Sequence, residues 1–563
     1  MTRRATVRKH GRICGHIEET SSRTYVFSYN AAWLSHEREW LSLTLPFDAH
    51  REPRELRNLP AFLEGLIPEG WLLAVASKLR PSLAADRFGL LLALARDCIG
   101  SASVEEAIEG GEVSAAVVSP PTIPYATAVD QRRPRENVYG RCLVCMHPIA
   151  SKTTFYHEAC AEQVFGTRVP FDVPFAQEQI EELAKQNIAA RLVVPGAQRK
   201  ISSSLLPAEG HGRDRLTLVG AGDGLFILKP EHPEVPTFPA NEHLAMSLMA
   251  RAGISTASHA LVMSADGKLA YVTRRFDREI KGGVSLKRLS MEDFGQLFDR
   301  VRRPEEKYKG SYDRVGSYLR ASSVLPQKDV VQFFDQVFVS YLIGNNDFHL
   351  RNLSVFTNGN SPRLTPAYDV TCTQLIDFEP DEDVTLPVDG KKTRLRQRNW
   401  IAFASRMGIS EGLAVRRMER LEKIWPDLHA EIRRSLLPEE QKTLLTQLMH
   451  QRLARALERD IIKNVRWEES VGQQANMSFD EAKKTETPIG RDARNEVRVQ
   501  ESKAAPTDPR VLANQRILPR SAKMLPRPVI RCAFPGCDAR RAPGKRLYCA
   551  DHSRLSTERK LER

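Results

Sequence analysis

Apolar residues recur with strand-like and helix-like spacings in the first part of the chain. RTYVFSY and WLSLTLP have the alternation and β-branched or aromatic content of strands, whereas LPAFLEGLI and DRFGLLLALA have helical spacing. Residues 1–110 are therefore predicted to form a small α+β unit.

A long amphipathic helix is predicted over DVVQFFDQVFVSYLI, residues 329–343, with a broad buried face and Gly344 placed to end it. The polar segment GNNDFHLRN, residues 344–352, follows at once. LSVF is then a short strand, TNGNS carries the Asn358-Gly359 hairpin signal, and RLT returns toward PAYD.

This hairpin predicts a catalytic group of residues. Asn352 precedes the outgoing strand and Asp369 follows the incoming one, so the two meet beside Asp347. Phosphoryl transfer needs such a set, in which one Asp accepts the proton of the attacking hydroxyl while the Asn and the second Asp hold Mg²⁺. The D-x4-N spacing equals that of the protein-kinase catalytic loop. The competing interpretation is a polar turn that only caps a helix.

A cation for the phosphates is expected upstream. LFILKPE is a strand that ends near Lys229, and Glu242 in NEHLAMSLMARAGI can pair with this lysine. The alternative for Glu242 is a first-turn residue favoured by the helix dipole. The hairpin SHALVMSADGKLAYVTRRFD ends at Arg274 to Asp277, where a hinge would meet an adenine, with Arg275 and Phe276 as the candidate contacts.

Two glycine segments compete for the role of phosphate loop. GAGDG, residues 220–224, is too close to Lys229 to fold back over it and is predicted to be a hairpin turn. In PGAQRK the backbone N–H groups of Gly196, Ala197 and Gln198 can reach phosphate as a nest.

Two cysteine and histidine clusters have the spacing of closed, structural Zn²⁺ sites, with His147 as a spare ligand in the first. The competing interpretation is an accidental clustering of free thiols. The predicted ligands are Cys142, Cys145, His157 and Cys160 in the first cluster, and Cys532, Cys537, Cys549 and His552 in the second.

Charge changes the picture mainly at the C-terminal end. The net charge is +13, and residues 501–563 hold 15 Lys/Arg against 6 Asp/Glu. This basic zinc-containing tail can hold nucleic-acid phosphates, dock a protein, or simply be solvated. We see neither a signal peptide nor a bilayer-spanning run, so we expect a cytoplasmic protein with reduced cysteines and no membrane partner.

Several motifs occur together in an order that is specific to one family. They are LEGLIPEGW, RFGLLLALARDCIGSA, GAQRK, FILKP, NEHLA, RRFDR, GNNDFHLRN and PAYD. With them the chain, over residues 1 to about 460, resembles the HipA family of toxin Ser/Thr kinases. The resemblance implies a two-lobed, protein-kinase-like α+β fold, ATP and Mg²⁺, and phosphorylation of a cellular protein that arrests growth. Some family members phosphorylate an aminoacyl-tRNA synthetase, and the usual partner is a small helix-turn-helix DNA-binding antitoxin.

Carried over by position, the resemblance makes Lys229 a phosphate ligand, Asp347 the base, and Asn352 and Asp369 the Mg²⁺ ligands. His349 is expected to position the loop, with a direct role left open. One departure is Val193, where family members often carry a Ser whose phosphorylation silences the kinase.

The domain organisation follows from these motifs and from two polar, proline-containing linkers. We predict a HipA-like N-terminal subdomain (1–110), a linker (111–140), a zinc-binding insert (141–167), a kinase N-lobe (168–277), a helical C-lobe (278–462), a disordered linker (463–528) and a basic zinc-finger-like module (529–563).

Two other functions remain as alternatives. The first is an inert kinase-like protein that binds nucleic acid or a partner through its zinc modules and tail. The intact catalytic set argues against it. The second is a kinase for a small molecule or lipid, because the same phosphate chemistry serves many acceptors.

Overall fold

A computed structural model describes residues 2–459, with gaps at 38, 51, 84, 97, 108–135, 169–170, 181, 183–197, 207–213, 218–223, 282–284 and 377–381. The predicted linkers, GAGDG and the C-terminal module therefore lie wholly or largely outside the described residues. The same holds for Val193, Gly196 and Ala197, and for Cys532, Cys537, Cys549 and His552. Within the described part, no helix is long and apolar enough to cross a membrane.

The N-terminal unit is a five-stranded antiparallel sheet covered by short helices. The strand order is β4-β3-β2-β1-β5, and the expected strand over RTYVFSY and helices over LPAFLEGLI and DRFGLLLALA are confirmed. The elements are β1 (Arg3–Lys9), β2 (Arg12–Glu19), β3 (Tyr25–Tyr29), α1 (Ala31–His36), β4 (Arg54–Leu56), α2 (Ala61–Glu64), α3 (Gly70–Leu79), α4 (Arg87–Leu94) and β5 (Ala102–Glu106).

The strand predicted over WLSLTLP is wrong, because residues 40–46 form turns instead. Their backbone donors bond to side chains far away in the sequence: Trp40 N–H donates to Asn360 Oδ1 at 2.8 Å, and Leu43 N–H donates to Glu292 Oε1 at 2.7 Å. A segment whose N–H groups are satisfied in this way needs no neighbouring strand. Leu41 and Leu45 are still buried, and Trp40 and Leu43 are partly buried, so the apolar pattern reflects burial rather than strand pairing.

A second sheet has six strands in the order β10-β11-β9-β7-β8-β6. Helix α7 (Phe238–Arg251) packs against β10 and β11. The short helix α5 (Glu158–Phe165) precedes this sheet. The strands are β6 (Phe171–Asp172), β7 (Ile201–Leu206), β8 (Asp214–Thr217), β9 (Phe226–Lys229), β10 (His259–Met263) and β11 (Leu269–Arg274).

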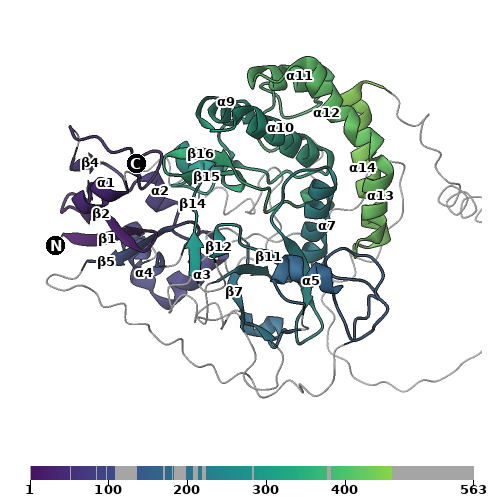
Figure 1. The fold of residues 1–563 in the computed structure, drawn as a ribbon, viewed down its shortest axis with the longest axis horizontal. Coiled ribbons are helices and arrows are strands. Elements are labelled where there is room, and N and C mark those ends of the chain that lie inside the picture. The colour runs from purple at the N-terminus through teal and green to yellow at the C-terminus, as the bar shows by residue number, and fades with distance from the viewer. Residues whose placement is uncertain are drawn as a thin grey trace, which may run out of the picture. The chain divides into compact units, whose positions relative to one another are not determined.

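The third part is mainly helical, and in Figure 1 its helices α9 to α14 lie together, apart from strands β1 to β5. Helix α10 packs against α9 and α14, and Phe338 and Tyr341 of α10 lie 4.8 and 5.0 Å from the ring of Trp400. The helices are α8 (Phe294–Leu297), α9 (Tyr312–Ser322), α10 (Pro326–Leu342), α11 (Gln397–Arg406), α12 (Glu411–Lys423), α13 (Trp425–Arg434) and α14 (Glu439–Leu457).

The hairpin after α10 forms as predicted. Gly344 adopts φ +73° just past the helix, a conformation that glycine reaches without strain. Strand β15 (Ser354–Asn358) pairs with β16 (Ser361–Leu364), and β14 (Ser290–Asp293) adds a third strand on the other side of β15. A separate hairpin is formed by β12 (Arg278–Lys281) and β13 (Ser285–Arg288).

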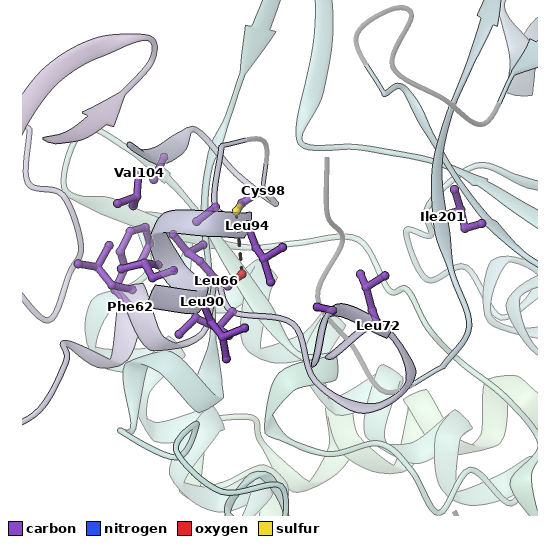
Figure 2. Packing of buried hydrophobic residues seen from close by; sticks show 14 of the residues in the cluster. Phe62, Leu66, Leu72, Leu90, Leu94, Cys98, Val104 and Ile201 are labelled. Carbon is purple, nitrogen blue, oxygen red and sulfur yellow. Dashed lines mark hydrogen bonds between the residues drawn. The ribbon is translucent and has the colours of Figure 1, made fainter. Parts of the chain in front are cut away.

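One hydrophobic core connects the N-terminal unit with the six-stranded sheet. Figure 2 shows Phe62, Leu66, Leu90 and Leu94 packed beneath Val104. The same cluster of buried residues extends to Ile201 and further side chains of β9, β10 and β11. The two parts therefore stabilise each other by burying shared apolar surface.

Substitution within this core should reveal that dependence. Leu90 is 0 % exposed, so Leu90→Ala should lower the free energy of unfolding by about 3 kcal/mol through lost burial and a residual cavity. Leu79 of α3 is 44 % exposed, and Leu79→Ala should change stability by less than about 0.5 kcal/mol. Denaturant titration of both variants checks this, and equal losses would contradict the assigned core.

Candidate active site

Residues predicted from five separate stretches of sequence line one pocket. It lies between the six-stranded sheet, the N-terminal unit and the loop after α10. Its lining includes Gln198, Lys229, Arg275, Phe276, Asp347, His349, Asn352 and Asp369. Glu242 is fully buried directly behind Lys229. Sequence reasoning therefore selected residues that share one site, apart from Gly196 and Ala197, which lie outside the described residues.

Lys229 is the charge at the centre of this pocket. Its Nζ lies 2.6 Å from Glu242 Oε1 and 2.5 Å from Asp369 Oδ1. Burial lowers the pKa of Lys229, but the two carboxylates outweigh burial and raise it above its ordinary value. Burial raises the pKa of Asp369, and Lys229 reverses this so that the carboxylate stays ionised.

Glu242 and Asp369 are held differently. Burial raises the pKa of Glu242 to about 7, against the opposing attraction of Lys229. Asp369 adopts φ +56°, a left-handed conformation that is uncommon for residues other than glycine and that clusters at functional sites. The short turn after β16 thus places the Asp369 carboxylate on Lys229.

The polar loop between α10 and β15 is fixed by its own hydrogen bonds. Asn352 Nδ2 donates to the Asp347 carbonyl at 2.9 Å, and the Asp347 N–H donates to Asn345 Oδ1 at 3.1 Å. Asn346 N–H donates to Thr373 Oγ1 at 2.7 Å. These bonds explain why so many polar side chains follow an apolar helix. They hold Asp347 and Asn352 at the pocket wall.

A tyrosine hydroxyl contacts the predicted base. Tyr308 OH donates to Asp347 Oδ1 at 2.7 Å, and its ring lies edge-on to His349 at 5.2 Å. Burial lowers the pKa of His349 well below its ordinary value, so its imidazole is neutral. A general base must lie within hydrogen-bond distance of the hydroxyl whose proton it removes. Asp347 already has this geometry toward the Tyr308 hydroxyl.

The predicted hinge is anchored to the N-terminal unit. The Arg275 guanidinium donates to Asp277 at 2.8–3.0 Å and to the Cys98 carbonyl at 2.9 Å. Phe276 lies 5.5 Å from the Phe356 ring. The side chain of Arg275 therefore serves to hold this segment, and Phe276 offers an apolar surface to the pocket.

Sequence reasoning missed Glu69, which precedes α3. Its carboxylate reaches Arg351 at 3.4 Å and Lys307 at 3.5 Å. Burial alone would raise the pKa of Glu69, but Arg351 and Lys307 lower it to about 2. The N-terminal unit thus contributes a charged residue to the wall of the pocket. The sequence around Glu69 in LEGLIPEGW carried no signal for these ion pairs, because both partners lie far along the chain.

Lys200 was also missed, although it belongs to the quoted GAQRK segment. It lines the pocket, and burial lowers the pKa of its amine to about 8. The nearby carboxylate of Asp369 partly opposes that shift. A second amine close to Lys229 makes the pocket attractive to anions.

The first cysteine cluster is assembled as its spacing predicted. The ligand atoms of Cys142, Cys145, His157 and Cys160 lie within 4.8 Å of one another, without His147. His157 Nε2 is 3.1 Å from the Pro148 carbonyl, which can only accept, so Nε2 carries the hydrogen and Nδ1 faces the thiols. Such a bond from the ring nitrogen that faces away from the thiols fixes the tautomer that a metal requires. Three thiols and one imidazole suit a closed tetrahedral site.

Two protein-family models match this chain. Residues 5–105 match the HipA N-terminal domain, and residues 192–432 match the HipA-like C-terminal domain. These two stretches of the chain are therefore similar to the two HipA domains. The pocket is lined by side chains from both matched stretches.

Individual relatives agree with this assignment. The HipA-like chain is 27 % identical over 425 residues to "Putative kinase Y4mE" of Sinorhizobium fredii, covering 73 % of this chain and 87 % of that protein. It is 29 % identical over 273 residues to "Putative kinase Y4dM" of the same organism, covering 45 % of this chain and 64 % of that protein. HipA of Shewanella oneidensis, solved with HipB and operator DNA, superposes with a TM-score of 0.54 at 18 % identity, covering 82 % and 98 %. That last likeness shows a shared fold.

The Glu69 contacts predict a pH-dependent contribution to stability. Because the folded pKa is depressed, the contribution is complete above about pH 4.5 and is lost as the pH falls toward 2. Glu69→Gln should therefore lower the free energy of unfolding by about 2–3 kcal/mol near pH 7, with a difference from wild type that shrinks through this window. The exposed Glu106→Gln serves as the control in urea titrations. A pH-independent difference would contradict the assigned ion pairs.

Proposed function

We propose that this HipA-like chain is an ATP- and Mg²⁺-dependent serine/threonine protein kinase that acts as a growth-arresting toxin. The observation that carries the proposal is the convergence of Asp347, Asn352 and Asp369 on Lys229 in one pocket. A polar turn that only caps α10 would have no reason to face a buried lysine from another sheet.

Each residue receives a role in phosphoryl transfer. Lys229 binds the nucleotide phosphates and is held in place by Glu242. Asn352 and Asp369 provide the oxygen ligands that suit Mg²⁺, which when bound neutralises phosphate charge. Nucleotide binding would replace the direct Lys229–Asp369 contact, because Lys229 would then bind the phosphates and Asp369 would bind Mg²⁺. Lys200 and Gln198 lie on the same wall and would contact the phosphates from the loop side.

Asp347 accepts the proton of the attacking hydroxyl. Tyr308 OH already donates to this carboxylate, so a Ser or Thr hydroxyl of the acceptor must displace it or lie beside it. His349, neutral and buried, keeps the loop in place behind the reacting groups. We propose a cytoplasmic protein as the acceptor, with an aminoacyl-tRNA synthetase as the first candidate.

The partner is proposed from the similar Shewanella protein, which was solved with HipB and DNA. By this likeness a small helix-turn-helix antitoxin would bind the chain. We further propose that Cys142, Cys145, His157 and Cys160 hold one structural Zn²⁺. The second zinc site and the nucleic-acid role of the basic tail stay predictions from sequence.

Two substitutions in the site should separate chemistry from nucleotide binding. Asp347→Asn keeps size and hydrogen bonding but cannot accept the proton, so transfer should fall on the order of a hundredfold or more while Mg²⁺–ATP still binds. Asp369→Asn removes charge from the metal site, so both transfer and Mg²⁺-dependent ATP binding should weaken. Calorimetry with a non-hydrolysable ATP analogue measures nucleotide binding. Transfer of labelled phosphate to lysate proteins measures the chemical step.

Asp299→Asn is the matched control, since the Asp299 side chain is 61 % exposed and does not line the pocket. It should retain transfer and growth arrest. Full transfer by Asp347→Asn would reject the kinase mechanism, and wild type that binds no nucleotide would favour the inert binding protein instead.

The metal proposal predicts the zinc content of purified protein. Cys145→Ser should lose about one equivalent of Zn²⁺ relative to wild type, because thiolate ligation contributes to the stability of a closed site. Cys14 is a buried thiol outside the cluster whose Sγ donates to the Val7 carbonyl, so Cys14→Ser should keep the wild-type content. Elemental analysis of fresh protein decides, and equal content in both variants would reject this site.

A further inference from the structure

The cysteine module packs on the edge of the six-stranded sheet. Strand β10 is an edge strand of this sheet, paired only with β11 among the described strands. Its Leu261 N–H donates to the Leu143 carbonyl at 2.8 Å, and Tyr156 OH donates to the Leu261 carbonyl at 2.9 Å. The turn formed by residues 142–145, here called the knuckle, thus takes the place of a further strand beside β10.

The knuckle also contacts helix α7. His243 Nε2 lies 2.9 Å from the Val144 carbonyl. A carbonyl can only accept, so Nε2 carries the hydrogen and donates it. His243 is almost fully buried, which makes this bond costly to lose. The carbonyls of Leu143 and Val144, both between the ligands Cys142 and Cys145, are therefore used by the sheet and by the helix respectively.

Three consecutive residues of α7 are each fixed by a different part of the chain. Asn241 exchanges two hydrogen bonds with the backbone of Cys372, at 2.7 and 3.1 Å. Glu242 pairs with Lys229 at 2.6 Å. His243 bonds to the knuckle at Val144. Successive residues on a helix point in directions about 100° apart, so this one turn is held from three sides.

We propose that the metal-bound knuckle positions Glu242 for nucleotide binding, with His243 as the positioning residue that links them. The inference rests on the proposed kinase function and deepens it. Metal ligation by Cys142 and Cys145 fixes the turn between them, and hence the Val144 carbonyl. Loss of the metal to a chelator frees that turn and lets the first part of α7 shift. Glu242 then no longer holds Lys229 in its phosphate-binding position.

The test compares wild type, His243→Ala and His243→Gln, each before and after the metal has been stripped and the chelator removed. With Mg²⁺ added back, affinity for a non-hydrolysable ATP analogue is measured by calorimetry. Hydrogen exchange of the α7 amides is followed in parallel. His243→Gln is the conservative variant, because its amide can donate to the same carbonyl.

His243→Ala should keep the wild-type zinc content, bind the analogue on the order of tenfold more weakly, and exchange the α7 amides faster. Stripping wild type should produce the same losses. Stripping His243→Ala should add little, because metal and histidine act through one path. His243→Gln should recover most of the affinity.

Two results would overturn the inference. One is that His243→Ala binds the ATP analogue as tightly as wild type and exchanges its α7 amides at the wild-type rate. The other is that removing the metal weakens analogue binding by the same factor in His243→Ala as in wild type. Equal factors would mean that the metal and His243 act independently. Neither readout needs phosphate transfer, so a wild type that binds nucleotide but transfers nothing would reject the kinase proposal while this coupling is still measured.

Discussion

The buried ion group of Lys229, Glu242 and Asp369 is the constraint on which the site depends. Removing three charges from water is costly, and the cost is offset only when the partners are in direct contact. Here one ammonium satisfies two carboxylates that come from different segments. Lys229 belongs to the sheet, Glu242 to α7, and Asp369 to the turn after β16. These three segments must therefore be correctly placed together, and Lys229 reaches the position proposed to bind phosphate only when they are.

The N-terminal domain takes part in the same arrangement through a second ion group. Glu69 contacts Arg351 and Lys307, which also line the pocket. The hinge segment adds to this connection, because Arg275 donates to the Cys98 carbonyl of the N-terminal unit. Together with the shared hydrophobic core, these contacts make the N-terminal domain a structural part of the candidate active site rather than an attached module.

The cysteine module adds a third point of support, on the side of α7 that carries His243. Its hydrogen bonds to Leu261 and His243 connect a predicted metal centre to the helix that carries Glu242. A small module with little core of its own gains rigidity from a metal. That rigidity can reach Lys229 only through residues that are already in contact, and His243 lies next to Glu242 in the chain.

The sequence by itself determined the features that depend on neighbouring residues. The amphipathic pattern and Gly344 located the end of α10, and the hairpin brought Asn352 and Asp369 together because its geometry is local. The spacing of the Cys142 cluster was readable for the same reason. Only the tertiary structure decided that Glu69 reaches Arg351, that Tyr308 donates to Asp347, and that residues 40–46 form turns. In each of these cases the partner lies far along the chain, and no local pattern records which distant group will satisfy a buried charge or N–H.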